Sequence, residues 1–265
     1  MDSPLSAAIA ERDKNTLDMV RSAIRKKQVL LAFQPVVQSV RPDRPAFYEG
    51  LIRVLDDQGR VIPAREFIDT AETTETGRLL DCLALELGLE TLRDNPELRL
   101  SINMSARSIG YQRWNDTLET FLDVDETIGE RLILEITEGS AMIMPDLVTV
   151  FMKRQQANGI SFALDDFGAG YTAFRYLKDF YFDLIKIDGA FIRGIADNPD
   201  NQILVEALLS VARHFDMFTV AEYVETEQDA AYLLSVGVDC LQGHYFGAAT
   251  IDPPWRQKAA AQMAG

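Results

Sequence analysis

The chain has 265 residues, 47% of them hydrophobic, which is enough to bury the core of an α/β barrel within one domain. Its formal net charge of −15 at pH 7 argues against a nucleic-acid polymer or an anionic membrane surface as a partner. The chain has only two cysteines and shows no signal-like or membrane-spanning apolar segment, so we expect a reducing, cytoplasmic setting.

The elements expected along the chain alternate between strands and helices. An amphipathic helix is expected over 5–27, with Leu17, Val20 and Ile24 on one face. Strand-like runs follow at 29–37, 46–55, 98–105, 131–138, 160–167, 182–188, 218–224 and 239–246. The longest helical patterns between them cover 76–92, 144–159 and 201–215. This alternation predicts an α/β fold of the modified TIM-type (βα)8 barrel class.

The first two strand-like runs depart from the parallel pattern. Only the segment QSVRPDRP (38–45) separates them, and a crossover helix needs a longer connection. We therefore expect an antiparallel hairpin at the start of the barrel.

Polar side chains gather toward the C-terminal ends of the later strands. Alternation places Ser101, Asn103 and Ser105 on one face of their strand. Glu135, Lys186 and Asp188 alternate with apolar neighbours in the same way. In barrels of this class the active site lies at the C-terminal ends of the strands, so these side chains are candidates for one site.

Two adjacent acids end one strand, in the stretch ALDDFGAGY (163–171). Asp165 and Asp166 can serve one site only if the backbone bends there, and we expect the neighbouring glycines to supply the bend. A single acid at a strand end usually caps a helix or faces solvent, but several converging carboxylates repel one another and call for bound cations. His214 and His244 lack a metal-ligand spacing, so oxygen ligands for Mg²⁺ or Mn²⁺ are expected rather than a zinc site.

Several short motifs occur in a fixed order between about residue 17 and residue 247. They are AFQPVV (32–37), YEGLIR (48–53), SINMS (101–105), LEITE (134–138), ALDDFGAGY (163–171), DLIKID (183–188), AEYVE (221–225) and LQGHYF (241–246). In this order and spacing the sequence resembles the EAL domain family of cyclic di-GMP phosphodiesterases. The resemblance implies a phosphodiesterase domain over 17–250, an N-terminal extension or helix over 1–16 and a C-terminal tail over 251–265.

The resemblance also implies a role for each matching residue. Family members hold two Mg²⁺ or Mn²⁺ ions, and the matching metal ligands here are Glu49, Asn103, Glu135, Asp165, Asp166 and Glu222, with Asp165 shared and Asp166 on the second ion. Glu222 matches a residue described as a metal ligand or as the general base, Lys186 matches the lysine that positions the attacking water, and Glu138 matches the acid that holds the DDFG loop. Gln34, Arg53 and Gln242 match positions that line the substrate.

The activity implied by the resemblance is hydrolysis of cyclic di-GMP to linear pGpG by metal-activated water. A homodimer that pairs through the barrel surface near the DDFG loop is implied as well. Two alternatives stay open: a catalytically weak cyclic di-GMP receptor or protein-interaction module, and a metal-dependent hydrolase of another small phosphodiester.

Three positions depart from the family pattern. Gly50 replaces an alanine, Tyr223 replaces the usual glycine of AEGVE, and Gly247, Ala248 and Ala249 replace the usual Ser-Lys/Arg-Pro ending. Tyr223 either adopts a positive φ, which would tilt Glu222, or continues a regular strand and points to the opposite face. Because FTVAEYV is rich in residues of high β-propensity, we expect the regular strand.

Overall fold

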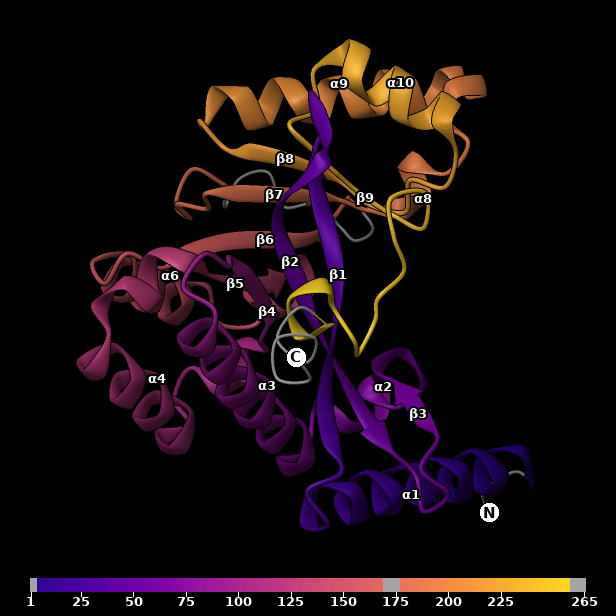
Figure 1. Ribbon diagram of the computed structural model, residues 1–265. Coiled ribbons are helices and arrows are strands. Elements are labelled where there is room, and N and C mark those ends of the chain that lie inside the picture. Colours follow the sequence, from indigo (N-terminus) through magenta and orange to yellow (C-terminus); the bar gives the residue numbers. More distant parts are fainter. Residues whose placement is uncertain (1–3, 169–176, 258–265) are drawn as a thin grey trace.

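The protein is described by a computed structural model that covers residues 4–168 and 177–257. Its strands form one sheet in the order β1-β9-β8-β7-β6-β5-β4-β2-β3, and the pairing of β1 with β2 closes the sheet into a barrel that leaves β3 outside (Figure 1). The strands are β1 (Val29–Gln38), β2 (Arg41–Leu55), β3 (Val61–Pro63), β4 (Leu100–Asn103), β5 (Leu132–Thr137), β6 (Ser161–Phe167), β7 (Leu184–Ile187), β8 (Phe218–Ala221) and β9 (Cys240–Gln242). The predicted modified (βα)8 barrel is confirmed.

Helices cover the outside of this barrel. Helices α3 and α6 pack against β4 and β6, and α9 packs against β7 and β8 (Figure 1). The α-helices are α1 (Pro4–Arg25), α2 (Ile68–Ala71), α3 (Glu75–Asp94), α4 (Gln112–Val124), α5 (Glu138–Ala141), α6 (Pro145–Gln156), α8 (Gly189–Ile192), α9 (Pro199–His214) and α10 (Glu227–Val236), and the 3₁₀ turns are η1 (Ala64–Glu66), η2 (Ala106–Ser108), η3 (Glu126–Arg131) and η4 (Ile195–Asp197). None of the described helices is both long enough and apolar enough to cross a membrane.

The first two strands form the expected antiparallel hairpin. Their register runs from Val29 opposite Val54 to Gln38 opposite Arg41, so most of the segment expected to be a loop is strand. Strand β1 also pairs antiparallel with β9, whereas β2 pairs parallel with β4. The hairpin thus reverses β1 alone, and the remaining barrel strands keep the parallel order that gathers their C-terminal ends at one edge.

The N-terminal helix α1 lies at the open end of this hairpin, opposite its turn (Figure 1). Val20 and Ala23 are buried in an apolar cluster with Phe67 of the β3–α2 connection, and Leu17 and Ile24 pack at its margin. The amphipathic face expected from the sequence is therefore the face that the protein buries. The helix continues without a break through residues 16 and 17, where the sequence suggested a domain boundary.

The barrel interior carries one apolar layer below the strand ends. Its buried members come from different strands and are Val36, Phe47, Ile133, Ala163, Leu184 and Val220. Because side chains two positions apart on a strand share a face, the next inward-facing residue on each parallel strand lies one layer closer to the C-terminal ends. A second, larger cluster fills the space between the strands and the surrounding helices.

Candidate metal centre

The layer above the apolar floor consists of charged side chains. Each follows an inward-facing apolar residue by two positions, and its members are Glu49, Glu135, Asp165, Lys186 and Glu222. All five are buried. The strand period thus explains why residues that are far apart in the sequence converge on one site.

A pocket of about 770 Å³ opens above this layer. Among the residues expected to form the site, its lining contains Gln34, Glu49, Arg53, Asn103, Glu138, Asp165, Asp166, Glu222 and Gln242. Glu135 and Lys186 are each 1% exposed; Lys186 forms ion pairs with the pocket residues Glu49, Asp165 and Glu222, and Glu135 pairs with Lys186. The structure therefore brings together the metal-ligand, catalytic and substrate-lining residues that the family resemblance implies. Ser101 and Asp188, which strand alternation also suggested, do not line the pocket.

Lys186 is the centre of the charged layer. Its Nζ lies 2.8 Å from Glu135 Oε2, 2.9 Å from Glu222 Oε1 and 3.1 Å from Asp165 Oδ1. The distance to Glu49 Oε2 is 3.5 Å. One ammonium group thus links four carboxylates that come from four different parts of the barrel.

Two amide side chains orient Glu49. Asn103 Nδ2 donates to Glu49 Oε1 at 2.8 Å, and Gln242 Nε2 donates to Glu49 Oε2 at 2.6 Å. Gln242, which the sequence placed at the substrate, therefore also fixes a carboxylate of the charged layer. Gln34 extends this chain of contacts: its Oε1 accepts from Gln242 Nε2 at 3.3 Å, and its Nε2 donates to the carbonyl oxygen of Gly247 at 3.1 Å.

Burial changes the proton affinity of the acids. It raises the pKa of Glu222 to about 8 and the pKa of Asp166 to about 6, with a further increase from the charge of Asp165. Burial also raises the pKa of Glu135 well above its ordinary value. For Glu49, burial acts in the same direction, but Lys186 and the two amide donors outweigh it and lower its pKa. The cluster therefore binds protons when no other cation neutralises it.

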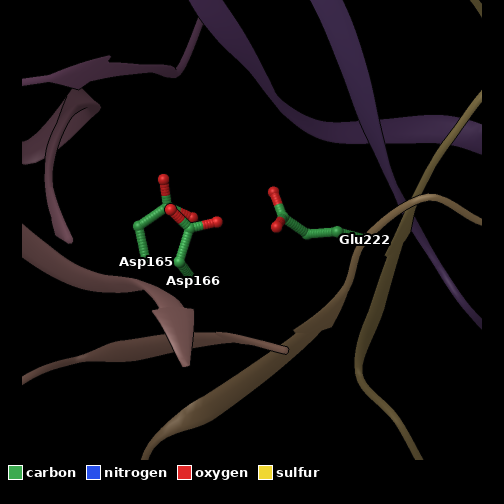
Figure 2. Close-up of side chains that lie close together, drawn as sticks. All are labelled: Asp165, Asp166 and Glu222. Carbon is green, nitrogen blue, oxygen red and sulfur yellow. The ribbon is translucent and has the colours of Figure 1, made fainter. Parts of the chain in front are cut away.

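The geometry of three acids fits a metal ion. Asp165, Asp166 and Glu222 each offer an oxygen, and these oxygens lie within 4.8 Å of one another (Figure 2). Among the described residues, Glu135 Oε1 is buried and accepts no hydrogen bond, and Asp165 Oδ1 faces the Lys186 ammonium group. Buried carboxylate oxygens that lack a donor suit a hard cation such as Mg²⁺ or Mn²⁺, so the donor set fits divalent metal.

The bend that brings the adjacent acids together begins at an acid. Strand β6 shifts register between Leu164 and Phe167 against β7, and Asp166 itself has a φ of 54°. Gly168 continues the turn with a φ of 98°, while Gly170 lies outside the described residues. The expectation that the glycines supply the bend holds for Gly168 but misses Asp166, which takes a left-handed conformation that aspartate tolerates better than most residues.

Glu138 connects the next strand to this turn. It is buried as the first residue of α5, directly after β5. Its Oε2 accepts a hydrogen bond from the backbone nitrogen of Gly168 at 3.4 Å. Gly168 is the last residue of the DDFG sequence, and the part of the loop that follows it lies outside the described residues.

The expectation for Tyr223 is wrong. Strand β8 ends at Ala221, and Tyr223 has a φ of 54°, so the residue does not continue a regular strand. The backbone nitrogen of Glu222 still donates to Ile187 of β7, but that of Val224 donates to Gln242 of β9. The chain changes partner at Tyr223, and local β-propensity carries no information about that change.

Arg65 is among the pocket residues that the sequence did not indicate. Arg65 lies on η1 and lines the pocket together with Arg53. Burial lowers the pKa of Arg53, and the positive charge of Arg65 lowers it further, against the opposing effect of Glu49. Neither the short strand β3 nor the η1 turn has a clear sequence pattern, so nothing marked Arg65 in advance. Asp188, a residue suggested by strand alternation, caps the N-terminus of α8: its Oδ1 accepts a hydrogen bond from the backbone nitrogen of Ala190 at 2.8 Å.

Comparison with known proteins identifies relatives over most of the chain. Residues 17–249 match the sequence model of the EAL domain. The chain is 30% identical over 235 residues to Cyclic di-GMP phosphodiesterase PdeF of Escherichia coli and 30% identical over 246 residues to Bifunctional diguanylate cyclase/cyclic di-GMP phosphodiesterase MucR of Pseudomonas aeruginosa. These matches cover 87% and 91% of this chain but only 31% and 36% of the relatives. The chain thus spans about a third of the length of these curated relatives.

Solved structures share the fold. The structure titled PaMucR Phosphodiesterase, c-di-GMP complex, superposes with a TM-score of 0.78 at 28% identity and covers 92% of this chain and 99% of that one. The FimX EAL domain from Pseudomonas aeruginosa bound to c-di-GMP superposes with a TM-score of 0.81 at 22% identity, over 89% and 96% of the two chains. Because the EAL sequence model matches most of its length, the chain belongs to the EAL domain family.

Proposed function

We propose that this chain is a metal-dependent phosphodiesterase that hydrolyses cyclic di-GMP to linear pGpG. The observation that carries the proposal is the convergence of the complete set of acids, with Asn103 and Lys186, on one pocket. Several relatives are named as cyclic di-GMP phosphodiesterases, which agrees with this assignment.

The roles proposed for the metal ligands are those that the family resemblance implies. Glu49, Asn103, Glu135 and Asp165 would hold one ion, and Asp166, with Asp165 shared and Glu222 nearby, would hold the second. Two divalent ions supply Lewis acidity, which lowers the pKa of water and neutralises charge on a phosphodiester. Lys186 keeps the carboxylates in place, since its ammonium group lies between them.

Glu222 is suited to handle a proton in this reaction. Burial raises its pKa to about 8, so this carboxyl group holds a proton more strongly than an ordinary glutamate does. Its Oε1 lies 2.9 Å from Lys186 Nζ, and this contact fixes the direction in which the carboxylate faces. We assign it as a ligand or as the general base, because both roles need the same placement.

The substrate would lie along the wall that carries Gln34, Arg53 and Gln242. Arg53 and Arg65 add positive charge at one side of an otherwise acidic pocket. A cyclic dinucleotide has two phosphates, and only one of them reacts at a time. The arginine side of the pocket is therefore suited to the phosphate that stays intact.

We also propose that the chain forms a homodimer and acts in the cytoplasm. Support for an interface comes from exposed apolar residues at the start of α6, the helix that leads into β6, namely Ile143, Met144, Leu147 and Val150. Sedimentation at micromolar concentration tests the dimer, because a monomer with full activity contradicts it.

The experiment that tests the function is a product assay. The purified protein is incubated with cyclic di-GMP and either Mg²⁺ or Mn²⁺, with and without EDTA, and the nucleotides are separated by anion exchange. We expect pGpG only when the metal is free to bind. Equal turnover in EDTA contradicts the metal-dependent mechanism, and binding without product identifies a receptor. A parallel incubation with another small phosphodiester measures substrate selectivity.

A further inference from the structure

The aromatic ring of Tyr223 contacts the first residue of α8 and the residue that caps the C-terminus of that helix. Arg193 places its guanidinium carbon 4.1 Å from the ring centroid. The second contact is with Gly189. A Cβ added to this glycine would lie 2.3 Å from Cδ2 of the ring and 2.6 Å from Cγ. Gly189 thus leaves the space that the ring occupies, and a larger residue there would collide with it.

The backbone of Tyr223 is strained. Its φ of 54° lies in the left-handed region, which a residue with a Cβ adopts only at a cost. Such conformations persist where the surroundings hold them, and they cluster at functional sites. Here the flanking residues are held by β7 and β9, since Glu222 N donates to Ile187 O at 3.2 Å and Val224 N donates to Gln242 O at 2.9 Å.

The contacts of the ring connect the ends of β7 and β8, and these two ends carry the ion pair between Lys186 and Glu222. Lys186 lies near the end of β7, and Gly189 begins α8 only three residues later. Glu222 directly precedes Tyr223 after β8. A shift of the ring away from Gly189 would therefore change the relative position of the two elements whose side chains meet at 2.9 Å.

We propose that Tyr223 is a positioning residue: its ring, packed on Gly189 and stacked with Arg193, holds the left-handed backbone that aims Glu222 into the charged layer. The inference rests on the proposed function and names a residue that acts through Glu222 rather than on the substrate. The phenol oxygen takes no part in this role, so the ring and the backbone conformation are the features that matter.

Three substitutions at this position separate the ring from the backbone. Tyr223→Phe keeps the ring and should match the parent. Tyr223→Ala loses the ring but keeps the Cβ that disfavours a positive φ, so it should lower kcat by about tenfold through a misplaced Glu222. Tyr223→Gly loses the ring but adopts a positive φ freely, so its kcat should lie nearer to the parent than that of Tyr223→Ala.

The readouts distinguish positioning from general structural support. The Mn²⁺ dissociation constant is measured without substrate from the electron paramagnetic resonance signal of free Mn²⁺, and kcat, KM and Tm are measured separately. We expect Tyr223→Ala to weaken Mn²⁺ binding and lower kcat while KM changes little. Parental kcat and Mn²⁺ affinity in Tyr223→Ala would overturn the proposal.

A double-mutant cycle tests the contact itself. Gly189→Ala places a methyl group against the ring and should weaken Mn²⁺ binding in the parent, whereas the same change in a Tyr223→Gly background should have little effect. Equal effects in both backgrounds would overturn the proposed packing. If the parent binds Mn²⁺ but produces no pGpG, the proposed function fails. The Mn²⁺ dissociation constants of the variants still decide the role of Tyr223. A parent that binds no Mn²⁺ overturns both.

Discussion

Replacing Lys186 with methionine tests the electrostatics of the site, because it removes the ammonium group around which four carboxylates are arranged. Methionine keeps most of the side-chain volume, so the change isolates the charge. Lys186 is 1% exposed, so its ion pairs with the carboxylates are shielded from bulk water. Breaking a buried ion pair by removing one partner costs about 3–5 kcal/mol, and we expect a loss of this size in the absence of metal.

The loss should depend on pH in a defined direction. Without the ammonium group the pKa values of Glu135 and Glu222, already raised by burial, rise further. A carboxyl group whose pKa is higher in the folded than in the unfolded protein destabilises the fold as pH rises, because the folded state then has to release the extra proton. The stability lost by Lys186→Met should therefore be larger at pH 8 than at pH 5.5.

The loss should also depend on metal, since bound dications neutralise the same carboxylates. Urea unfolding is measured at both pH values, in EDTA and in saturating Mn²⁺, and Lys153→Ala on the exposed surface of α6 serves as the control with a change below about 0.5 kcal/mol. Mn²⁺ should restore much of the stability of Lys186→Met but not its hydrolysis of cyclic di-GMP. An equal loss of stability in all four conditions would refute the electrostatic explanation and indicate that the packing of the methionine side chain causes the loss instead.

Other predictions concern the metal, the pocket wall and two buried acids. Mg²⁺ or Mn²⁺ should support hydrolysis, whereas Ca²⁺, which accepts looser geometry, should support substrate binding with little turnover in the same product assay. Arg65→Ala should raise KM by roughly tenfold, the equivalent of one hydrogen bond to a charged group, with kcat nearly unchanged in steady-state kinetics. Glu138→Ala should lower Mn²⁺ occupancy, measured by calorimetry, by freeing the turn at Gly168, and an unchanged affinity would contradict that role. Burial raises the pKa of Asp81 to about 7, so its ionisation should reduce stability as pH rises from about 4 to 7; urea unfolding of Asp81→Asn should lack this part of the pH dependence, and identical pH profiles would contradict it.

Strand periodicity made most of the charged layer predictable. Glu135 and Lys186 alternate with apolar residues in strands whose pairing is regular, so an analysis of alternation places them correctly on the inward face. The hairpin was predictable for a similar local reason, because the connection between β1 and β2 is too short for a helix. Alternation did not predict that the apolar residues two positions before the charged ones form a single buried layer beneath them.

Features that depend on tertiary contacts were not predictable. Tyr223 lies in a segment of high β-propensity, yet its backbone turns there: the backbone nitrogen of Glu222 donates to β7, whereas that of Val224 donates to β9. Asp166 likewise turns before the glycines, at the point where β6 shifts register against β7. Arg65 reaches the pocket through β3, a strand of three residues that is too short to leave a periodic signal.

The central claim is that the acid cluster turns cyclic di-GMP over rather than only holding it. The most direct measurement follows both bound and converted nucleotide in one sample of protein, Mn²⁺ and cyclic di-GMP, for the parent and for Asp165→Asn, in which one carboxylate of the charged layer is neutral. We predict that the parent converts the dinucleotide to pGpG, while Asp165→Asn leaves it intact. A parent that retains bound, intact cyclic di-GMP over many hours, or a variant that produces pGpG at the parental rate, would contradict the account.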